Sequence, residues 1–325
     1  MVLTPGQRAL LGLLADGEFH SGAELGQALG VSRAAIWKAL GKLEALELPL
    51  ERTRPHGYRI AGGVDLHDAA AIRAALGDAA RSLLRDINVF DVIDSTNEQA
   101  KRAADPLNGG GICYLAERQT GGRGRLGRRW VSPFACNLYL TVAWEFDGGI
   151  AVVEGLSLAV GVAARRALAA VGVTDIGLKW PNDLLRSGRK LGGILIEVIG
   201  DPQGLCRVIT GIGINVAMPA AAAREIDQPW RDLSDCRISR DRLAAALLEQ
   251  LLPLLHDFPE RGFRAYRREW EAAHVHQGRP VRISTGSRVV DGIARGVNEQ
   301  GALALECADG LRFISGGEVS LREGP

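Results

Sequence analysis

The segment 119–130 holds the densest group of side chains able to act on anionic substrates. Its glycines fit a GxGxxG pattern and alternate with arginines: Gly122, Arg123, Gly124, Arg125, Gly127 and Arg128. That pattern marks a dinucleotide site only where it opens a helix after a strand, and Pro133 leaves no room for such a helix. Glycines let the backbone approach a ligand, and arginines bind phosphates and carboxylates. The segment therefore predicts a pliable loop for a reaction that joins two anions, in preference to a solvated basic loop.

A second segment, 179–194, combines lysines, an aspartate and glycines. Lys190 comes just before an expected buried strand, where an ammonium group can stabilise charge that grows on a phosphoryl group. Asp183 could orient a basic side chain or hold Mg²⁺ through water. A surface lysine remains the alternative for Lys190 on its own. The sequence has no HExxH spacing and no paired CxxC cysteines, so we expect no metal site made by a protein motif.

A third candidate is the run Ser95-Thr96-Asn97, with Glu98 behind it. Ser95 and Glu98 fit a capping box, which places the run at the start of a helix. Its hydroxyl and amide groups can donate to and accept from a neutral polar ligand. Taken alone, the run is better explained as a helix cap.

The chain divides into three regions with different predicted secondary structure, and these regions must position the candidate groups. Residues 1–63 predict three short helices and a hairpin, with helices near 5–15, 21–29 and from 32, and extended pieces at 50–53 and 58–60. Residues 64–273 mix helices at 68–84, 96–104, 152–171 and 240–258 with strands at 89–93, 137–144, 193–199 and 207–216. Residues 274–325 alternate short β segments with turns and predict a small β-barrel. The fold class is therefore α+β, with a winged helix-turn-helix, a mixed-sheet catalytic domain and this barrel.

Charge within the N-terminal region favours DNA binding. Residues 31–59 carry six basic against three acidic side chains, whereas residues 1–30 carry one against three. Basic residues thus gather on the third helix and the hairpin, which meet phosphates in winged-helix proteins. A module for protein contact or dimerisation is the alternative. The predicted DNA-binding residues are Ser32, Arg33, Trp37, Lys38, Arg52 and Arg54.

Composition sets broad limits. The chain has 325 residues, a net charge of +1, 46% hydrophobic and 24% charged residues, which is ordinary for a soluble globular protein. No apolar run reaches the length of a membrane span and no signal peptide is recognisable. We therefore expect a cytoplasmic protein with no membrane partner.

The order and spacing of these motifs resemble the biotin–protein ligase family, in its branch that also represses the biotin operon. The matching stretches are Ser95–Asn97, 119–130, 179–183 and 189–194, and the glycine-rich run 211–216 is similar. Residues 29–36 look like the helix-turn-helix of the repressor branch, and residues 274–325 look like the family's small SH3-like β-barrel. The resemblance covers nearly the whole chain, and the glycine–arginine loop with Lys-Trp-Pro-Asn-Asp is its most specific part.

The resemblance implies a two-step reaction. Biotin and ATP, with Mg²⁺, form biotinyl-5′-adenylate, and a lysine of a biotin carboxyl carrier protein then takes the biotin. It also implies that the adenylate favours a homodimer that binds operator DNA. Arg125 and Lys190 are the predicted catalytic residues. The predicted biotin and adenylate contacts are Ser95, Thr96, Asn97, Gln119, Gly122, Arg123, Gly124, Arg125, Trp130, Lys179, Asn182, Asp183, Lys190, Gly193 and Asn215.

Two other functions remain open: a lipoate–protein ligase with similar chemistry, and a regulator that senses ligand without catalysis. The glycine–arginine loop together with Lys-Trp-Pro-Asn-Asp favours biotin. The chain departs from the family pattern in three places. Leu126 stands where another arginine is expected, Ala135-Cys136 where a glycine is expected, and Trp37 is unexpected on the recognition helix.

Overall fold

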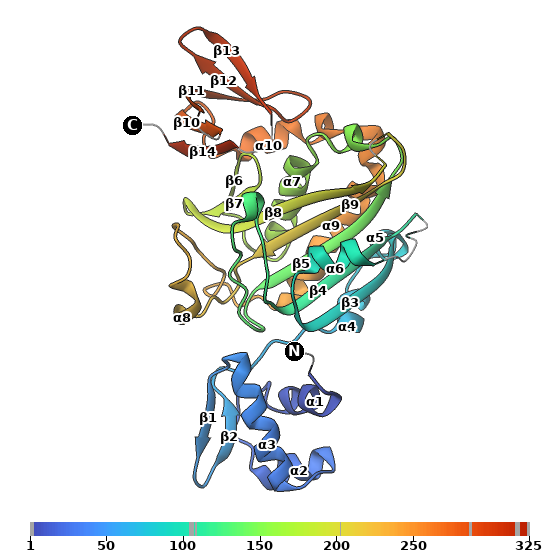
Figure 1. Ribbon diagram of the computed structural model, residues 1–325, viewed down its shortest axis with the longest axis vertical. Helices are drawn as coiled ribbons and strands as arrows, with labels where there is room; N and C mark the ends of the chain where they lie inside the picture. Colours follow the sequence, from blue (N-terminus) through green and yellow to red (C-terminus); the bar gives the residue numbers. More distant parts are fainter. Residues whose placement is uncertain are drawn as a thin grey trace.

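The computed structural model describes residues 3–103, 107, 109–201, 203–285, 288–315 and 319–323. Figure 1 shows an N-terminal helical unit at one end, a large sheet with helices in the middle, and a small β unit at the other end. The predicted α+β organisation is confirmed. The predicted boundaries at residues 63 and 273 stay predictions.

The N-terminal unit is a winged helix. Its elements are α1 (Pro5–Leu13), α2 (Gly22–Leu29), α3 (Arg33–Leu43), the short η1 (Glu44–Leu46), β1 (Leu50–Thr53) and β2 (Gly57–Ile60). Capping boxes begin α1 at Thr4 and α2 at Ser21, and Gly30 ends α2 with φ 65°. Leu10, Ile36 and Leu40 are buried in its core. The three predicted helices and the hairpin are confirmed.

The central unit is built on a seven-stranded sheet in the order β3-β4-β5-β9-β8-β7-β6. β3 and β4 pair in parallel and the other neighbours are antiparallel, so the sheet is mixed as predicted. The strands are β3 (Leu84–Ile93), β4 (Gly111–Gln119), β5 (Leu138–Phe146), β6 (Ile176–Lys179), β7 (Asp183–Arg186), β8 (Arg189–Gly200) and β9 (Cys206–Ile214).

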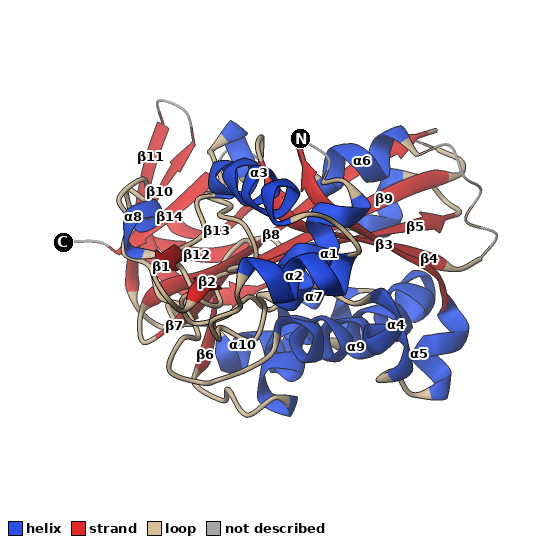
Figure 2. Ribbon diagram, turned by 90° about the horizontal axis from the view of Figure 1, so that it is seen from below, coloured by secondary structure: helices blue, strands red, loops and turns tan. Residues whose placement is uncertain are grey.

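Helices cover both faces of this sheet. Figure 2 shows α4 (Ala69–Ala74), α5 (Asp78–Leu83), α7 (Leu156–Ala170) and α9 (Arg240–Arg261) together on one side, and α6 (Thr96–Arg102) away from them. The apolar face of α9 is long and packs against α7, and its leucines are buried in the main core. The short α8 (Ala220–Ala223) and the turn η3 (Ile150–Val153) lie in connecting segments. Among the described residues, no helix is long and apolar enough to cross a membrane.

Several predicted elements differ from the structure. The single helix expected over 68–84 is two helices, because the chain turns at Gly77, which caps α5. The helix expected from 152 begins only at Leu156, since Gly155 adopts φ 72°. The strands β4, β6 and β7 were not predicted. Ala104, the expected end of the helix that begins at Thr96, lies outside the described residues.

The C-terminal unit follows η4 (Phe263–Ala265) and α10 (Arg267–Ala273). Its strands are β10 (Pro280–Thr285), β11 (Arg288–Val297), β12 (Leu303–Cys307), β13 (Gly310–Ile314) and β14 (Val319–Glu323). They form an antiparallel sheet in the order β13-β12-β11-β10-β14, irregular between Ala294 and Val297. The predicted small β-domain is confirmed. Val281 and Leu303 join the same buried cluster as the central unit.

Candidate active site and DNA-binding face

A cavity of about 850 Å³ lies where α6, the loop after β4, the β6–β7 turn and strands β8 and β9 meet. Of the predicted biotin and adenylate contacts, all but Gly122 and Asn215 line it. These lining residues are Ser95, Thr96, Asn97, Gln119, Arg123, Gly124, Arg125, Trp130, Lys179, Asn182, Asp183, Lys190 and Gly193. The fold thus brings four separate sequence segments to one site.

One end of the cavity is neutral and polar, and its side chains are fixed by one another. The amide and hydroxyl of Thr96 both donate to Gln119 Oε1, at 2.9 and 3.1 Å. Gln119 Nε2 donates in turn to the Ser132 hydroxyl at 3.3 Å. Thr141 donates to Asn97 Oδ1 at 2.7 Å. Because these groups hold one another in place, they require little reorganisation to bind a neutral polar head group.

The strand β9 approaches this polar end very closely. A Cβ atom at Gly211 would lie 2.3 Å from Asn97 Oδ1, and one at Gly213 would lie 2.7 Å from the Trp130 indole. Asn97 is held from its other side, because its Nδ2 donates to Glu197 at 2.8 Å. Glycine at these two positions therefore makes room for the side chains that face the cavity.

Cationic groups lie at the centre of the cavity. Lys190 Nζ is 2.8 Å from Asp183 Oδ1 and 5.8 Å from the Trp130 ring centroid. Burial lowers the pKa of Arg125, an effect that nearby Asp183 opposes. A guanidinium remains charged after any ordinary shift, so Arg125 and Lys190 provide positive charge beside the polar end.

The glycine–arginine loop closes on itself through its backbone. The Gly124 N–H donates to Arg128 O at 2.7 Å, and the Trp130 N–H donates to Gly122 O at 2.9 Å. Leu126 has φ 59° at the tip. Ion pairs also attach the loop to the domain, Arg123 with Glu98 and Arg129 with Glu225. The loop lines the cavity with its arginines.

Two predicted contacts do not line the cavity. A Cβ at Gly122 would lie 2.8 Å from the Ser132 hydroxyl, so this glycine allows close packing behind the cavity wall. Gly211 and Gly213 lie on the side of β9 that faces the cavity. Asn215 comes after the last residue of β9, so the alternation of sides along the strand no longer applies to it. Its Nδ2 donates to Arg231 O at 3.2 Å, so it holds the segment after α8.

Other lining residues escaped the sequence analysis. Arg128 and Arg129 belong to the loop motif and could have been included. The segment 225–229 carries no motif, because backbone pairing of β8 with this distant segment brings it in: the Lys190 N–H donates to Pro229 O at 3.0 Å. The missed residues include Glu225, Asp227, Gln228 and Pro229 of this segment, Tyr139 of β5, and His276.

The site suits the joining of a carboxylate to a phosphate. A neutral polar end can hold the body of an acid, and Lys190 and Arg125 can neutralise two anions brought together. Asp183 is a partly buried carboxylate beside them, and one carboxylate together with substrate phosphates is a usual protein contribution to Mg²⁺ binding. No cluster of three potential metal ligands occurs among the described residues, so Mg²⁺ would enter with the nucleotide.

The winged helix presents the predicted DNA-binding residues. Ser32 caps α3 by accepting from the Ala35 N–H at 3.2 Å, which leaves its O–H able to donate to a phosphate. Arg33, Trp37 and Lys38 are exposed on α3, and Arg54 is exposed at the tip of the hairpin. Arg52 is also exposed but pairs with Glu44 at 2.5 Å, which weakens its expected role at a phosphate. These groups lie away from the cavity.

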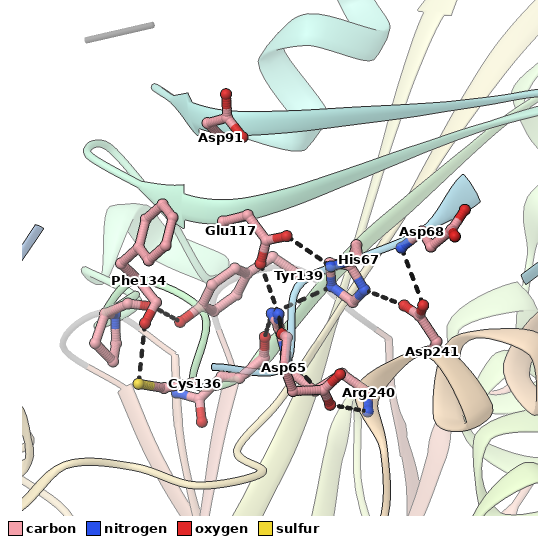
Figure 3. A network of polar contacts seen from close by, with 12 residues as sticks. Asp65, His67, Asp68, Asp91, Glu117, Phe134, Cys136, Tyr139, Arg240 and Asp241 are labelled. Carbon is pink, nitrogen blue, oxygen red and sulfur yellow. Dashed lines mark hydrogen bonds and ion pairs between the residues drawn. The ribbon is translucent and has the colours of Figure 1, made fainter. Parts of the chain in front are cut away.

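A buried polar network attaches the segment that follows the winged helix to the central unit (Figure 3). Arg240, at the start of α9, donates to Glu117 Oε2 at 2.6 Å, and both side chains are almost fully buried. Glu117 Oε1 accepts from the His67 N–H at 2.7 Å, and Asp65 Oδ2 accepts from the Arg240 N–H at 2.7 Å. The segment that leads out of the winged helix is therefore held in a fixed path.

The comparisons with known proteins agree with this arrangement. The bifunctional ligase/repressor BirA of Salmonella typhimurium is 39% identical over 315 residues, which cover 96% of both chains. The chain belongs to the bifunctional biotin ligase/repressor family. The Escherichia coli member is 38% identical over the same share. Family models match an HTH domain at 7–59, the biotin/lipoate A/B protein ligase family at 89–215 and the biotin protein ligase C-terminal domain at 276–322.

Solved structures of biotin ligases have the same fold. The biotin protein ligase from Aquifex aeolicus in complex with biotin and ATP matches with a TM-score of 0.63 and 27% identity, over 74% of this chain and 100% of that chain. The family member described here adds a winged helix to that shared catalytic fold.

Proposed function

We propose that this chain is an ATP-dependent biotin–protein ligase that also binds operator DNA as a repressor. The observation that carries the ligase proposal is the cavity in which a preorganised polar end adjoins Lys190 and Arg125. Family membership supports biotin as the acid, in preference to lipoate. Catalysis needs more than a ligand-sensing pocket, and the two partly buried cations Lys190 and Arg125 beside the polar end supply it.

In the first step, a carboxylate oxygen of biotin attacks the α-phosphorus of ATP and pyrophosphate leaves. Thr96, Asn97 and Gln119 hold the head group of biotin. Lys190 and Arg125 stabilise the negative charge that grows on the α-phosphate as the two anions meet. Asp183 orients Lys190 and would accept Mg²⁺ that arrives with the triphosphate.

In the second step, the neutral amine of a lysine on a biotin carboxyl carrier protein attacks the carbonyl carbon of the adenylate. The C–O bond to the phosphate breaks and AMP leaves. The loop at 119–130 covers the anhydride and reduces its hydrolysis, because several of its residues line the cavity.

The ligase proposal is tested by pyrophosphate release from purified protein with ATP and either biotin or lipoate. We expect release with biotin only. Lys190→Ala and Arg125→Ala should each lower kcat by about 100- to 1,000-fold, the usual loss for one electrostatic donor. Arg242→Ala, an exposed arginine at the start of α9, is the matched control. Release with lipoate alone, or wild-type rates in both cavity variants, would overturn the proposal.

The repressor proposal is carried by the exposed basic face of α3 and the hairpin. We infer that the adenylate favours a cytoplasmic homodimer that binds a two-fold operator, because two winged helices then contact successive half-sites. A gel-shift assay with a pool of duplexes, with and without biotin and ATP, tests it. DNA binding that is the same with and without biotin and ATP would exclude control by the adenylate. Absence of DNA binding under both conditions would exclude the repressor function.

A further inference from the structure

The indole ring of Trp37 lies on the exposed face of α3 and is largely accessible to solvent. The Trp37 side chain is 63% exposed, more than any other large apolar side chain among the described residues. Arg33 and Gly41 lie one helical turn to either side of it, and a Cβ at Gly41 would meet nothing within 4 Å. A large apolar ring in open solvent is unfavourable unless a partner covers it.

The surroundings of Trp37 indicate the charge of that partner. Among the ion pairs found between described residues, none involves Arg33, Lys38 or Lys42 of α3. By contrast, Arg59 on the hairpin pairs with Glu51 at 2.8 Å. The cations around the indole are therefore available to a polyanion, and duplex DNA is the polyanion that a winged helix accommodates.

We propose that Trp37 is a specificity-determining residue that contacts a thymine methyl group in the major groove. This inference rests on the proposed DNA binding and goes beyond it, because it names the base. The C5 methyl of thymine is the apolar group that base pairs present in the major groove. The exposed apolar ring of the indole matches that methyl group rather than a phosphate.

The position of Trp37 on α3 allows this contact. It lies in the N-terminal half of the helix, five residues after the cap Ser32, and recognition helices contact base edges from that half. Ala34 and Gly41 are exposed and small, so the helix can approach the groove closely on both sides of the ring. Arg33 and Lys38 then reach the phosphates that border the groove.

The test uses the full chain with biotin, ATP and Mg²⁺, and a duplex selected for tight binding from a random pool. Each thymine of that duplex is replaced in turn by uracil, which removes the methyl group and leaves base pairing unchanged. At one position or more in each half-site, uracil should weaken wild-type binding by about 4-fold, the change expected for one buried carbon group. Trp37→Gln should bind the thymine and uracil duplexes equally.

Lys42→Gln is the matched control, an exposed residue of the same helix. It should weaken binding to every duplex by the same factor, lower the salt dependence, and keep the sensitivity to uracil. Thermal unfolding of each variant checks that the winged helix is intact. The inference is wrong if no uracil substitution weakens wild-type binding, or if uracil weakens the binding of Trp37→Gln as much as that of the wild type. Either result leaves the proposed DNA binding intact. A Trp37→Gln variant that binds DNA normally but no longer dimerises also overturns it, because the ring then covers a protein contact. Failure to select any duplex defeats the repressor proposal itself.

Discussion

Replacing Arg240 by leucine should destabilise the protein strongly, because it leaves a buried charge without its partner. The Arg240 side chain is 2% exposed and that of Glu117 is 0% exposed. Arg240 also donates to Asn137 O at 3.1 Å and to Asp65 O. Removal of one partner of a buried, hydrogen-bonded ion pair costs about 3–5 kcal/mol. That is a large part of the roughly 5–15 kcal/mol by which proteins are stable.

Urea unfolding followed by circular dichroism measures this effect. With an m value of about 3 kcal/mol per molar urea, the midpoint of Arg240→Leu should fall by at least about 1 M. Adding Glu117→Gln removes the stranded charge and should restore about 1–3 kcal/mol. Arg242→Leu, two residues along α9 and exposed, should change stability by less than about 0.5 kcal/mol. If the double variant is less stable than Arg240→Leu, the stranded charge is not the cause and the reasoning fails.

Three further changes test other parts of the structure. Gly211→Ala should displace Asn97 and raise the KM for biotin more than the KM for ATP, as steady-state kinetics would show; equal changes would contradict the placement of the polar end. His274→Phe should make stability less dependent on pH: burial lowers the pKa of His274 to about 4, so its contribution is present above about pH 6.5 and is lost as the pH falls toward 4. That loss amounts to about 2 kcal/mol at pH 5. Urea unfolding of the variant and the wild type at pH 7 and pH 5 measures it, and an equal change in the free energy of unfolding in both proteins would show that His274 titrates normally. Trp180→Phe removes the bond from the indole N–H to Gly301 O, 3.0 Å long, and should cost about 1–3 kcal/mol; an unchanged thermal midpoint would argue against that bond.

The winged helix could be predicted from the sequence because its signals are local. Capping boxes at Thr4 and Ser21 and the glycine after α2 fix helix ends within a few residues of chain. The glycine–arginine loop is recognisable for the same reason, since its backbone freedom and charge are properties of consecutive residues. Ala135, which departs from the glycine of the family pattern, has φ 53°, in the left-handed region that favours glycine.

Features that depend on distant pairing could not be predicted. The strands β6 and β7 have four residues each, and their pairing with each other and with β8 defines them. The cavity wall near Pro229 exists because β8 pairs with a segment far along the chain. Likewise, nothing local signals that Arg240 meets Glu117, 123 residues away. Charge pairs of this kind are visible only in three dimensions.

The C-terminal unit and the central unit share one hydrophobic interior, and this has a practical consequence for engineering. Leu303 and Leu305 pack in the same cluster as Trp180, whose indole is capped by Gly301 and whose neighbours Lys179 and Pro181 line the cavity. An exchange of tails between related ligases would therefore replace one wall of a common interior. A functional chimera should require the residues around Trp180 to be exchanged together with the tail.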